Sequence, residues 1–262
     1  PNYLTTPIYY VNGVPHLGHL YTTLVGHFFS QWKRSSGEYT LVMGGTDEHG
    51  AKVAEAAQKR GYDENNIKQF CDDVSATFSK AWTEFGLAPD TFHRTTSPEH
   101  KESVIWMWKQ LARNGYIYLG KHQGWYCKSD ETFVPETQLI KDQETGEFTT
   151  ALGHKVEWIE EENFKFRLSA FIQPLLQYYT DHPNAIYPPV QRNNVLSMTK
   201  GLEDISISRL SKNLSWSIDV PEDTEYWDET TQTLRQSHEI TQEKHKIYVW
   251  LDALNIYITG AR

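Results

Sequence analysis

Residues 3–19 read YLTTPIYYVNGVPHLGH. Most of residues 3–11 are β-branched or aromatic, which predicts a buried strand. The Asn-Gly pair at 12–13 is a turn signal, and a helical run follows over 17–35. Strand, turn and helix in this order are typical of a parallel α/β sheet, whose binding sites lie at the carboxyl ends of the strands.

The same order repeats directly downstream. A short apolar strand is predicted over 39–43, a loop with the sequence GGTDEHG over 44–50, and a helix over 51–60. Helical spacing returns over 64–85 and over 98–114. We therefore predict an α/β fold built on a parallel sheet.

The pattern changes after Gly115. The predicted elements are then small strands and turns over 116–132, an exposed loop or hairpin over 141–155, a strand over 164–168 and a helix over 169–182. We interpret residues 116–185 as a small inserted α+β module that divides the sheet domain.

After this module the α/β pattern resumes. Residues 246–251 predict a strand and 252–259 the start of a helix, whereas the polar stretch 222–246 predicts a surface excursion. The predicted organisation is a first half of the sheet domain at 1–115, the inserted module at 116–185 and the start of the second half at 186–262.

The composition sets limits on function. Of the 262 residues, 39% are hydrophobic and 23% charged, and no run of about 18 apolar residues occurs, so no membrane partner is expected. The net charge of −9 argues against a protein whose main task is to grip nucleic acid, and no DNA partner is expected. Cys71 and Cys127 are too few for a disulfide framework or a four-cysteine zinc site, and they indicate a reducing compartment.

The segment PHLGH, residues 15–19, carries a recognisable chemistry. His16 and His19 are three residues apart, so they share one face of the predicted helix, and Gly18 leaves room for a ligand between them. A helix N-terminus favours phosphate groups, and two imidazoles placed there are able to donate hydrogen bonds to a triphosphate. Taken alone, the pair is equally compatible with ordinary surface or capping histidines.

The same segment resembles the His-Ile-Gly-His signature of class I aminoacyl-tRNA synthetases, with leucine in place of isoleucine. That signature also occurs in other nucleotidylyl transferases. The matching blocks, in chain order, are TTPIYYVNGVPHLGH (5–19), GTDEHG (45–50), GWYCKSDE (124–131), GLEDISISR (201–209) and YVWLDALNIY (248–257). Together they resemble the methionyl-tRNA synthetase family from about Tyr3 to Gly260.

The resemblance implies a fold and a reaction. The fold is a class I synthetase Rossmann-like parallel sheet split by a small connective module. The reaction activates L-methionine with ATP, bound with Mg²⁺ as a co-substrate, and transfers the methionyl group to tRNA(Met). The implied ATP-site residues are Asn12, Gly13, His16, Gly18 and His19, of which His16 and His19 are the catalytic pair.

The resemblance also implies a methionine site. Its residues are Ile8, Tyr10, Asp47, Trp250, Ala253, Leu254 and Tyr257. Asp47 matches the carboxylate that holds the substrate ammonium group, although it precedes a predicted helix closely enough to be an N-cap instead. The residues at 250–257 match a strand-to-helix corner that encloses the thioether, and Leu254 is the weakest match because the family often has proline there.

Other residues of the matching blocks have ordinary structural interpretations. Trp216 is expected to be a packing residue, and Arg209 a salt-bridge partner. Neither is assigned a ligand.

The inserted module departs from the family pattern. Many members carry cysteine pairs that bind structural zinc, whereas Cys127 has no second cysteine near it and only His122 and His154 as further candidate ligands. We therefore predict a zinc-free module, held by aromatic packing among Trp125, Tyr126, Trp158 and Phe166. A metal-free module is what we expect of mitochondrial relatives, and this analogy alone predicts the mitochondrial matrix, with the cytoplasm as the alternative.

The resemblance also predicts that the C-terminal part of the family pattern is missing. The lysine-rich signature loop and the helical anticodon-binding domain would follow Arg262. Three alternatives remain: another class I synthetase, for cysteine, leucine, isoleucine or valine; a catalytically idle, ligand-binding fragment; and a small-molecule nucleotidylyl transferase, which fits the later blocks poorly.

Overall fold

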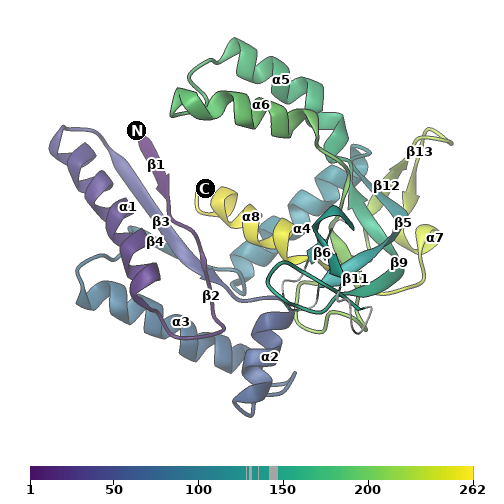
Figure 1. Cartoon of the computed structure of the whole chain (residues 1–262), viewed down its shortest axis with the longest axis horizontal. Coiled ribbons are helices and arrows are strands. Elements are labelled where there is room, and N and C mark those ends of the chain that lie inside the picture. Colours follow the sequence, from purple (N-terminus) through teal and green to yellow (C-terminus); the bar gives the residue numbers. More distant parts are fainter. Residues whose placement is uncertain (128, 130–131, 135, 142–146, 262) are drawn as a thin grey trace.

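The computed structural model describes residues 1–127, 129, 132–134, 136–141 and 147–261. Its helices are α1 (Leu17–Ser35), α2 (Ala51–Lys59), α3 (Ile67–Glu84), α4 (Pro98–Arg113), α5 (Ile172–Asp181), α6 (Arg192–Lys200), α7 (Ser237–Ile240) and α8 (Val249–Thr259), and Figure 1 shows their arrangement. Its strands are β1 (Asn2–Thr5), β2 (Tyr9–Tyr10), β3 (Thr40–Asp47), β4 (Thr91–Arg94), β5 (Ile117–Cys127), β6 (Thr132–Val134), β7 (Ile140–Lys141), β8 (Phe148–Thr149), β9 (Glu157–Phe166), β10 (Ile205–Ser206), β11 (Ser208–Leu210), β12 (Glu225–Asp228), β13 (Thr233–Gln236) and β14 (His245–Ile247).

The predicted parallel sheet is confirmed, and β3 is its central strand. Met43 of β3 pairs with Thr5 of β1 and with Thr91 of β4, so β1 and β4 lie on opposite edges of β3. The single strand predicted over 3–11 is wrong in one respect, because it is interrupted between β1 and β2. The interruption contains Pro7, which has no N–H to donate to a ladder.

Strand β3 is longer than predicted. The expected strand ended at residue 43, yet the structure continues it through Gly44 and Gly45 to Asp47. The two glycines look like a loop signal, but they allow β4 to approach. A Cβ atom on Gly45 would lie 2.1 Å from the carbonyl oxygen of His93. Strand β4 itself was not predicted.

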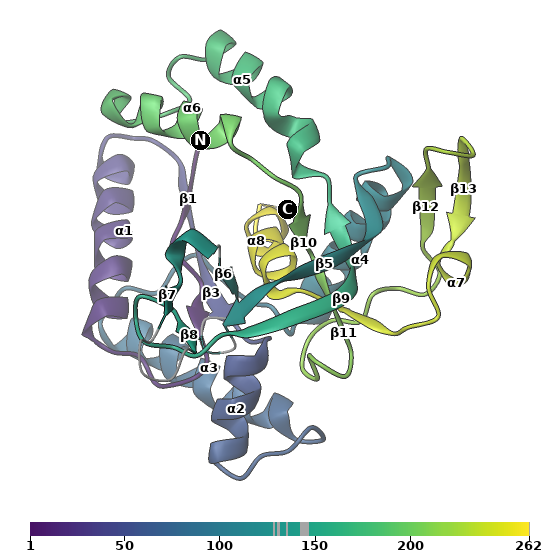
Figure 2. The ribbon, with the colours of Figure 1, turned by 45° about the vertical axis from the view of Figure 1, so that its right-hand side comes forward.

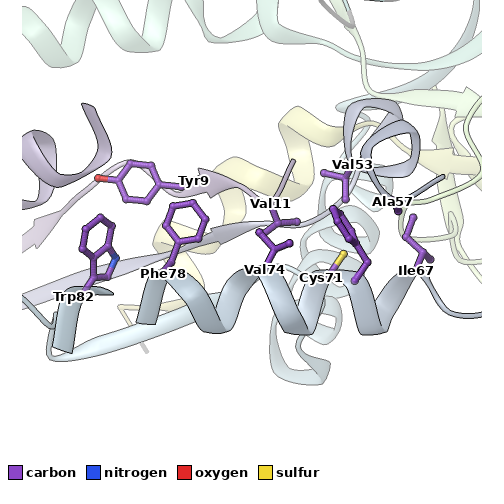
Figure 3. Close-up of a cluster of buried hydrophobic side chains, with 10 residues drawn as sticks. Tyr9, Val11, Val53, Ala57, Ile67, Cys71, Val74, Phe78 and Trp82 are labelled. Carbon is purple, nitrogen blue, oxygen red and sulfur yellow. The ribbon is translucent and has the colours of Figure 1, made fainter. Parts of the chain in front are cut away.

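The helices predicted over 17–35, 51–60, 64–85 and 98–114 are confirmed as α1 to α4, apart from small shifts at their ends. The apolar face of α3 explains why it packs on the sheet: Phe70, Val74, Phe78 and Trp82 recur every four residues and are all buried. Figure 3 shows Val74, Phe78 and Trp82 of this row beneath Tyr9 and Val11. Each side chain of this size contributes about 1.5–3 kcal/mol when it is fully buried.

A second, antiparallel sheet follows, with the strand order β10-β9-β5-β6. Residues 117–127 form one continuous strand, so the prediction of several small strands and turns over 116–132 is wrong. The cause is tertiary: β5 pairs with β9 from Ile117 opposite Phe166 to Tyr126 opposite Glu157. Residues 142–146 of the predicted 141–155 loop lie outside the described residues, and β7 and β8 flank them as an antiparallel pair.

The helix predicted over 169–182 is confirmed as α5, preceded by a short 3₁₀ turn (Leu168–Phe171). Helices α5 and α6 pack on each other and extend away from the sheets, as Figures 1 and 2 both show. Of the predicted aromatic contacts, Trp125 and Trp158 meet edge to face with ring centroids 5.5 Å apart. Phe166 contacts Phe171 instead, at 5.4 Å.

The polar stretch 222–246 is more than a surface excursion. It forms the β12–β13 hairpin and α7, which Figure 2 shows to one side of the second sheet. Tyr226 is buried, its ring stacks on Phe164 with centroids 5.0 Å apart, and its hydroxyl accepts a 3.0 Å hydrogen bond from Nε1 of Trp108. One aromatic residue in a polar stretch thus anchors the hairpin in the core.

The strand predicted over 246–251 is wrong beyond Ile247. Strand β14 ends there, and α8 begins at Val249 rather than at residue 252. A short apolar run is compatible with either a strand or a buried helix, and the packing of Val249 and Ala253 favours the helix.

In the part of the chain that the structure describes, we find no helix with the length and apolarity to cross a membrane.

Candidate active site

The two predicted catalytic histidines lie together at the N-terminus of α1. His16 is the N-cap of the helix, and its ring stacks on that of His19 with centroids 3.7 Å apart. His19 also packs against Tyr9 and Phe78, with centroids at 4.6 and 5.3 Å. These ring contacts orient both imidazoles at the start of the helix.

Hydrogen bonds determine which nitrogen of each ring carries its proton. The Gly18 N–H donates to Nδ1 of His16 at 3.1 Å, and the His16 N–H donates to Nδ1 of His19 at 3.3 Å. Since both Nδ1 atoms accept, each neutral ring carries its hydrogen on Nε2. Burial, followed by the proximity of His16, lowers the pKa of His19 and favours its neutral form. The pair therefore presents two Nε2–H donors.

The remaining predicted ATP-site residues are Gly18, in the first turn of α1, and Asn12 and Gly13, which precede the helix. Gly18 gives the cap room, because a Cβ atom there would lie 3.0 Å from Cε1 of His16, a tight contact that would require the His16 ring to shift. Asn12 and Gly13 form the turn between β2 and α1, as predicted, and a Cβ atom on Gly13 would meet nothing within 4 Å. The turn is therefore open on the side of Gly13.

Asp47 ends β3 and is only 3% exposed. Its alternative assignment as an N-cap is wrong, because Gly50 occupies that position of α2. Asp47 lies opposite Tyr10 in the parallel ladder, so two predicted methionine-site residues share one edge of the sheet.

The neighbouring Glu48 holds this edge in place. Its carboxylate accepts hydrogen bonds from Nε and Nη2 of Arg94, at 2.7 and 2.8 Å, and it is fully buried. A bidentate, charge-assisted pair of this kind is directional, and it ties the end of β3 to the end of β4. Trp216 adds a third hydrogen bond to Glu48, because its Nε1–H donates to the backbone carbonyl of Glu48 at 2.5 Å. The packing role predicted for Trp216 thus includes a specific hydrogen bond.

The other predicted methionine-site residues gather around the start of α8. Ile8 packs against the buried cluster of Tyr248, Val249 and Ala253. Trp250 and Leu254 are on the same helix but are 49% and 59% exposed, so neither is enclosed by the described residues. The structure therefore brings Ile8 to the cluster that contains Ala253 and leaves Trp250 and Leu254 at the surface.

The two remaining predicted residues, Tyr257 and Tyr10, make other contacts. The backbone carbonyl of Tyr257, one turn beyond Ala253, accepts a 2.9 Å hydrogen bond from the Tyr3 hydroxyl. On β2, the ring of Tyr10 lies 6.0 Å from Nζ of Lys52.

A cavity of about 650 Å³ adjoins the cluster. Its lining includes Gly50, Tyr248 and Val249, together with Tyr126 of β5 and Arg209 of β11. This volume is within the range of small-molecule sites. The salt-bridge role predicted for Arg209 is confirmed, since its Nε lies 3.7 Å from Glu161.

Sequence reasoning missed several residues of this region. Tyr248 and Val249 lie inside the block at 248–257, and Glu48 lies inside the block at 45–50. The signal that points to Glu48 is a carboxylate next to a buried strand, because a buried carboxylate requires a partner. Its partner, Arg94, is on β4, a strand that the sequence did not predict.

No group of three His, Cys, Asp or Glu side chains is arranged to hold a metal ion among the residues described. Cys127 is buried, while Lys128, Asp130 and Glu131 of its block lie outside the described residues. Absence of zinc from the module therefore stays a prediction.

Comparison with known proteins places this geometry in a family. Residues 2–262 match the family model of class I tRNA synthetases (M). The chain belongs to this family. Its parallel sheet is accordingly the Rossmann-like catalytic domain of a class I synthetase.

Individual relatives agree with the family match. The chain is 43% identical, over its whole length, to a probable mitochondrial methionine–tRNA ligase of Neurospora crassa, of which it covers 39%. It is 39% identical to the methionine–tRNA ligase of Thermotoga maritima, with 98% of this chain and 37% of that protein covered. The chain thus spans about two fifths of the length of the curated relatives it matches.

The fold is similar to that of solved structures of the family. The methionyl-tRNA synthetase of Mycobacterium tuberculosis, crystallised with bound methionyl-adenylate, has a TM-score of 0.82 and 35% identity. That match covers 100% of this chain and 47% of the M. tuberculosis chain.

Proposed function

We propose that this chain is the amino-acid-activating part of a methionine–tRNA ligase, an ATP-dependent, AMP-forming enzyme that charges tRNA(Met). The observation that carries the proposal is that β2 and the residue before it contact three groups. Tyr9 packs on His19 of the histidine pair, Tyr10 pairs with Asp47, and Ile8 packs on the cluster that contains Ala253. Each of these three groups is predicted to bind part of the substrates. The relatives named above support methionine as the amino acid.

The histidine pair binds the triphosphate of ATP in this proposal. The Nε2–H groups of His16 and His19 donate to phosphate oxygens, and the N-terminus of α1 adds its dipole. Asn12 and Gly13 line the approach to this helix end, and Gly18 allows the cap that orients His16. Mg²⁺ enters with ATP as part of the substrate.

Methionine binds on the other side of the β2–β3 edge. The Asp47 carboxylate accepts hydrogen bonds from the substrate ammonium group, a charge-assisted contact that fixes its orientation. Ile8 and Ala253 form the apolar floor, with Tyr10, Trp250, Leu254 and Tyr257 around it. The thioether packs well against aromatic faces, and closure of the exposed Trp250 over the bound side chain would bury both.

The chemistry follows from this placement. The methionine carboxylate oxygen attacks the α-phosphorus, the new carboxyl–phosphorus bond forms, and the bond to the β-phosphate oxygen breaks to release pyrophosphate. The histidines stabilise negative charge on the departing phosphates, and no covalent enzyme intermediate is needed. The tRNA 3′-terminal hydroxyl then attacks the carbonyl, and AMP leaves.

We also propose the domain boundaries 1–115, 116–185 and 186–262. The β5, β6 and β9 strands support the inserted module, because they pair with one another and not with the parallel sheet; β10, from the 186–262 segment, completes their sheet by pairing with β9. Limited proteolysis would test the boundaries: cuts near 115 and 185 agree with them, and cuts only inside β5 or β9 contradict them.

For location we propose the mitochondrial matrix. The mitochondrial relative of Neurospora crassa supports this, while a bacterial relative is nearly as similar. Imaging a fluorescent fusion of the full-length protein would decide between matrix and cytoplasm.

Titration with L-methionine tests the proposed function directly. We expect a saturable change in tryptophan fluorescence for methionine, and none for leucine, isoleucine or cysteine. Asp47→Asn should weaken methionine binding at least about 10-fold, because a hydrogen bond between charged groups contributes roughly 1.5–3 kcal/mol. Asp181→Asn, which changes an exposed carboxylate on α5, is the matched control and should bind like the wild type.

The other outcomes are equally informative. Binding of leucine, isoleucine or cysteine instead would indicate another class I synthetase. A folded chain that binds none of these amino acids would contradict the proposed methionine site.

A further inference from the structure

A buried cluster that the proposed mechanism does not use joins three elements of the catalytic domain. Asp252 of α8 lies between two imidazoles: its Oδ2 is 2.6 Å from Nδ1 of His49, and its Oδ1 is 2.7 Å from Nε2 of His100. All three side chains are at most 2% exposed. His49 follows the end of β3, and His100 is in the first turn of α4.

The charge state of Asp252 makes these contacts directional. Burial alone would raise its pKa, but the charge of His49 and the hydrogen bonds from His100 and His49 outweigh burial, and the pKa of Asp252 is lowered. The carboxylate is therefore ionised and accepts from both rings. Nδ1 of His49 and Nε2 of His100 are both donors, which fixes the orientation of each ring.

The position of the cluster connects it to the methionine site. Asp252 is two residues after Trp250 and directly precedes Ala253, while His49 is two residues after Asp47. One carboxylate thus links the first turn of α8 to the carboxyl end of β3. His100 extends the link to α4, and its Nδ1 lies 3.1 Å from the hydroxyl of Thr259 at the other end of α8.

Stability alone is a poor explanation for this arrangement. Burying charged and polar groups is costly, and apolar residues of the same volume commonly stabilise a fold as well. What an apolar contact does not provide is a fixed angle and distance between the two elements.

We infer that Asp252 is a positioning residue that, through His49, sets α8 at the distance from the β3 edge which the methionine site requires. The inference rests on the proposed function, since it assigns the cluster to that site. Asp252 does not contact substrate. It fixes where Ala253 and Trp250 stand relative to Asp47.

The two histidines allow a test that leaves the buried carboxylate in place. An asparagine side-chain amide reproduces the position of a histidine Nδ1, and a glutamine amide that of Nε2. His49→Asn therefore keeps the donor to Asp252, and His49→Gln misplaces it. For His100 the order reverses, so His100→Gln keeps the donor and His100→Asn misplaces it.

Methionine affinity is the first readout, measured by calorimetry on chains shown to be folded by circular dichroism. We expect His49→Asn and His100→Gln to bind within about threefold of the wild type, and His49→Gln and His100→Asn to bind roughly 10-fold or more weakly. The decisive result is that asparagine is tolerated at position 49 and glutamine at position 100. A general loss of stability would not produce opposite preferences at the two positions, whereas loss of the hydrogen bond to Asp252 would. Equal losses for both amides at each position, or unchanged affinity in all four variants, would overturn the inference.

Two ligand-free readouts separate this inference from the proposed function. Nitrogen-15 shifts of the histidine rings should show hydrogen on Nδ1 of His49 and on Nε2 of His100. Hydrogen exchange of the amides over 249–253 should be faster in His49→Gln than in His49→Asn. If the wild type binds no methionine but these readouts hold, the proposed function fails while the positioning of α8 stands; if exchange is the same in both variants, the positioning fails.

Discussion

His16 has two tasks at the scale of a single residue. Its Nδ1 caps α1 by accepting from Gly18, and its Nε2 remains as the donor that we assign to a phosphate oxygen. The two tasks use opposite sides of one ring, so the cap that stabilises the helix also determines the chemistry the ring offers. A substitution that separates these tasks distinguishes a catalytic histidine from a capping histidine.

His16→Asn is that substitution. Asparagine is among the best N-cap residues, so the free energy of unfolding should stay within about 0.5 kcal/mol of the wild type, while His16→Ala should lose about 1 kcal/mol. Both variants lack the Nε2–H donor. In both, ATP–pyrophosphate exchange in the full-length enzyme should fall roughly 100-fold or more with methionine affinity unchanged. If His16→Asn keeps full exchange activity, His16 is a cap and nothing more.

At the scale of elements, the sheet edge depends on how closely β3 and β4 approach. Gly45 lies where β3 passes the His93 carbonyl, and just beyond it Glu48 and Arg94 join the carboxyl ends of the two strands. Asp47 lies between these two contacts. The geometry of the proposed methionine site is therefore determined by backbone packing as much as by its own side chains.

Gly45→Ala tests this dependence. Because its Cβ would lie 2.1 Å from a backbone oxygen, the strands must separate, and we expect a loss of more than about 3 kcal/mol in the free energy of unfolding by urea. Gly201→Ala is the control, since its Cβ would have only ordinary contacts at 3.7 and 3.9 Å, and it should change stability by less than about 1 kcal/mol. Similar small losses in both variants would mean that β3 and β4 adjust freely.

At the scale of the whole molecule, one buried and two half-buried histidines couple stability to pH. Burial is the largest cause that lowers the pKa of His19, His93 and His245. In the unfolded chain these rings bind protons near pH 6.5, whereas in the folded chain they bind protons only at lower pH. Stability that depends on the neutral rings is therefore present above that pH and is lost as the pH falls.

We expect the free energy of unfolding, from urea titrations, to decrease between pH 7.5 and pH 5.5. One histidine contributes at most about 1.4 kcal/mol per pH unit. His245, the most buried of the three, is the best site for a check, and His245→Leu should show a shallower dependence. A wild-type stability that is constant over this range would contradict the assignment.

Local patterns in the sequence were sufficient for much of this protein. The helices α1 to α4, the parallel arrangement and the placement of His16 and His19 at a helix start follow from periodicity, turn residues and capping signals. These signals extend over only a few residues, so they can be recognised without knowledge of the rest of the chain. The matching blocks then indicated the family.

Only the tertiary structure decided how the site is held together. The Glu48–Arg94 pair and the cluster of His49, His100 and Asp252 join residues that are far apart in sequence and whose local patterns carry no sign of each other. The same holds for the length of β5 and the start of α8, where pairing and packing chose between strand, turn and helix. Long-range contacts decide these features for a physical reason. A short apolar run is compatible with strand, turn or helix, and a buried charge is compatible with several partners, so the local sequence does not distinguish among them. The contact formed in the folded chain determines which one occurs.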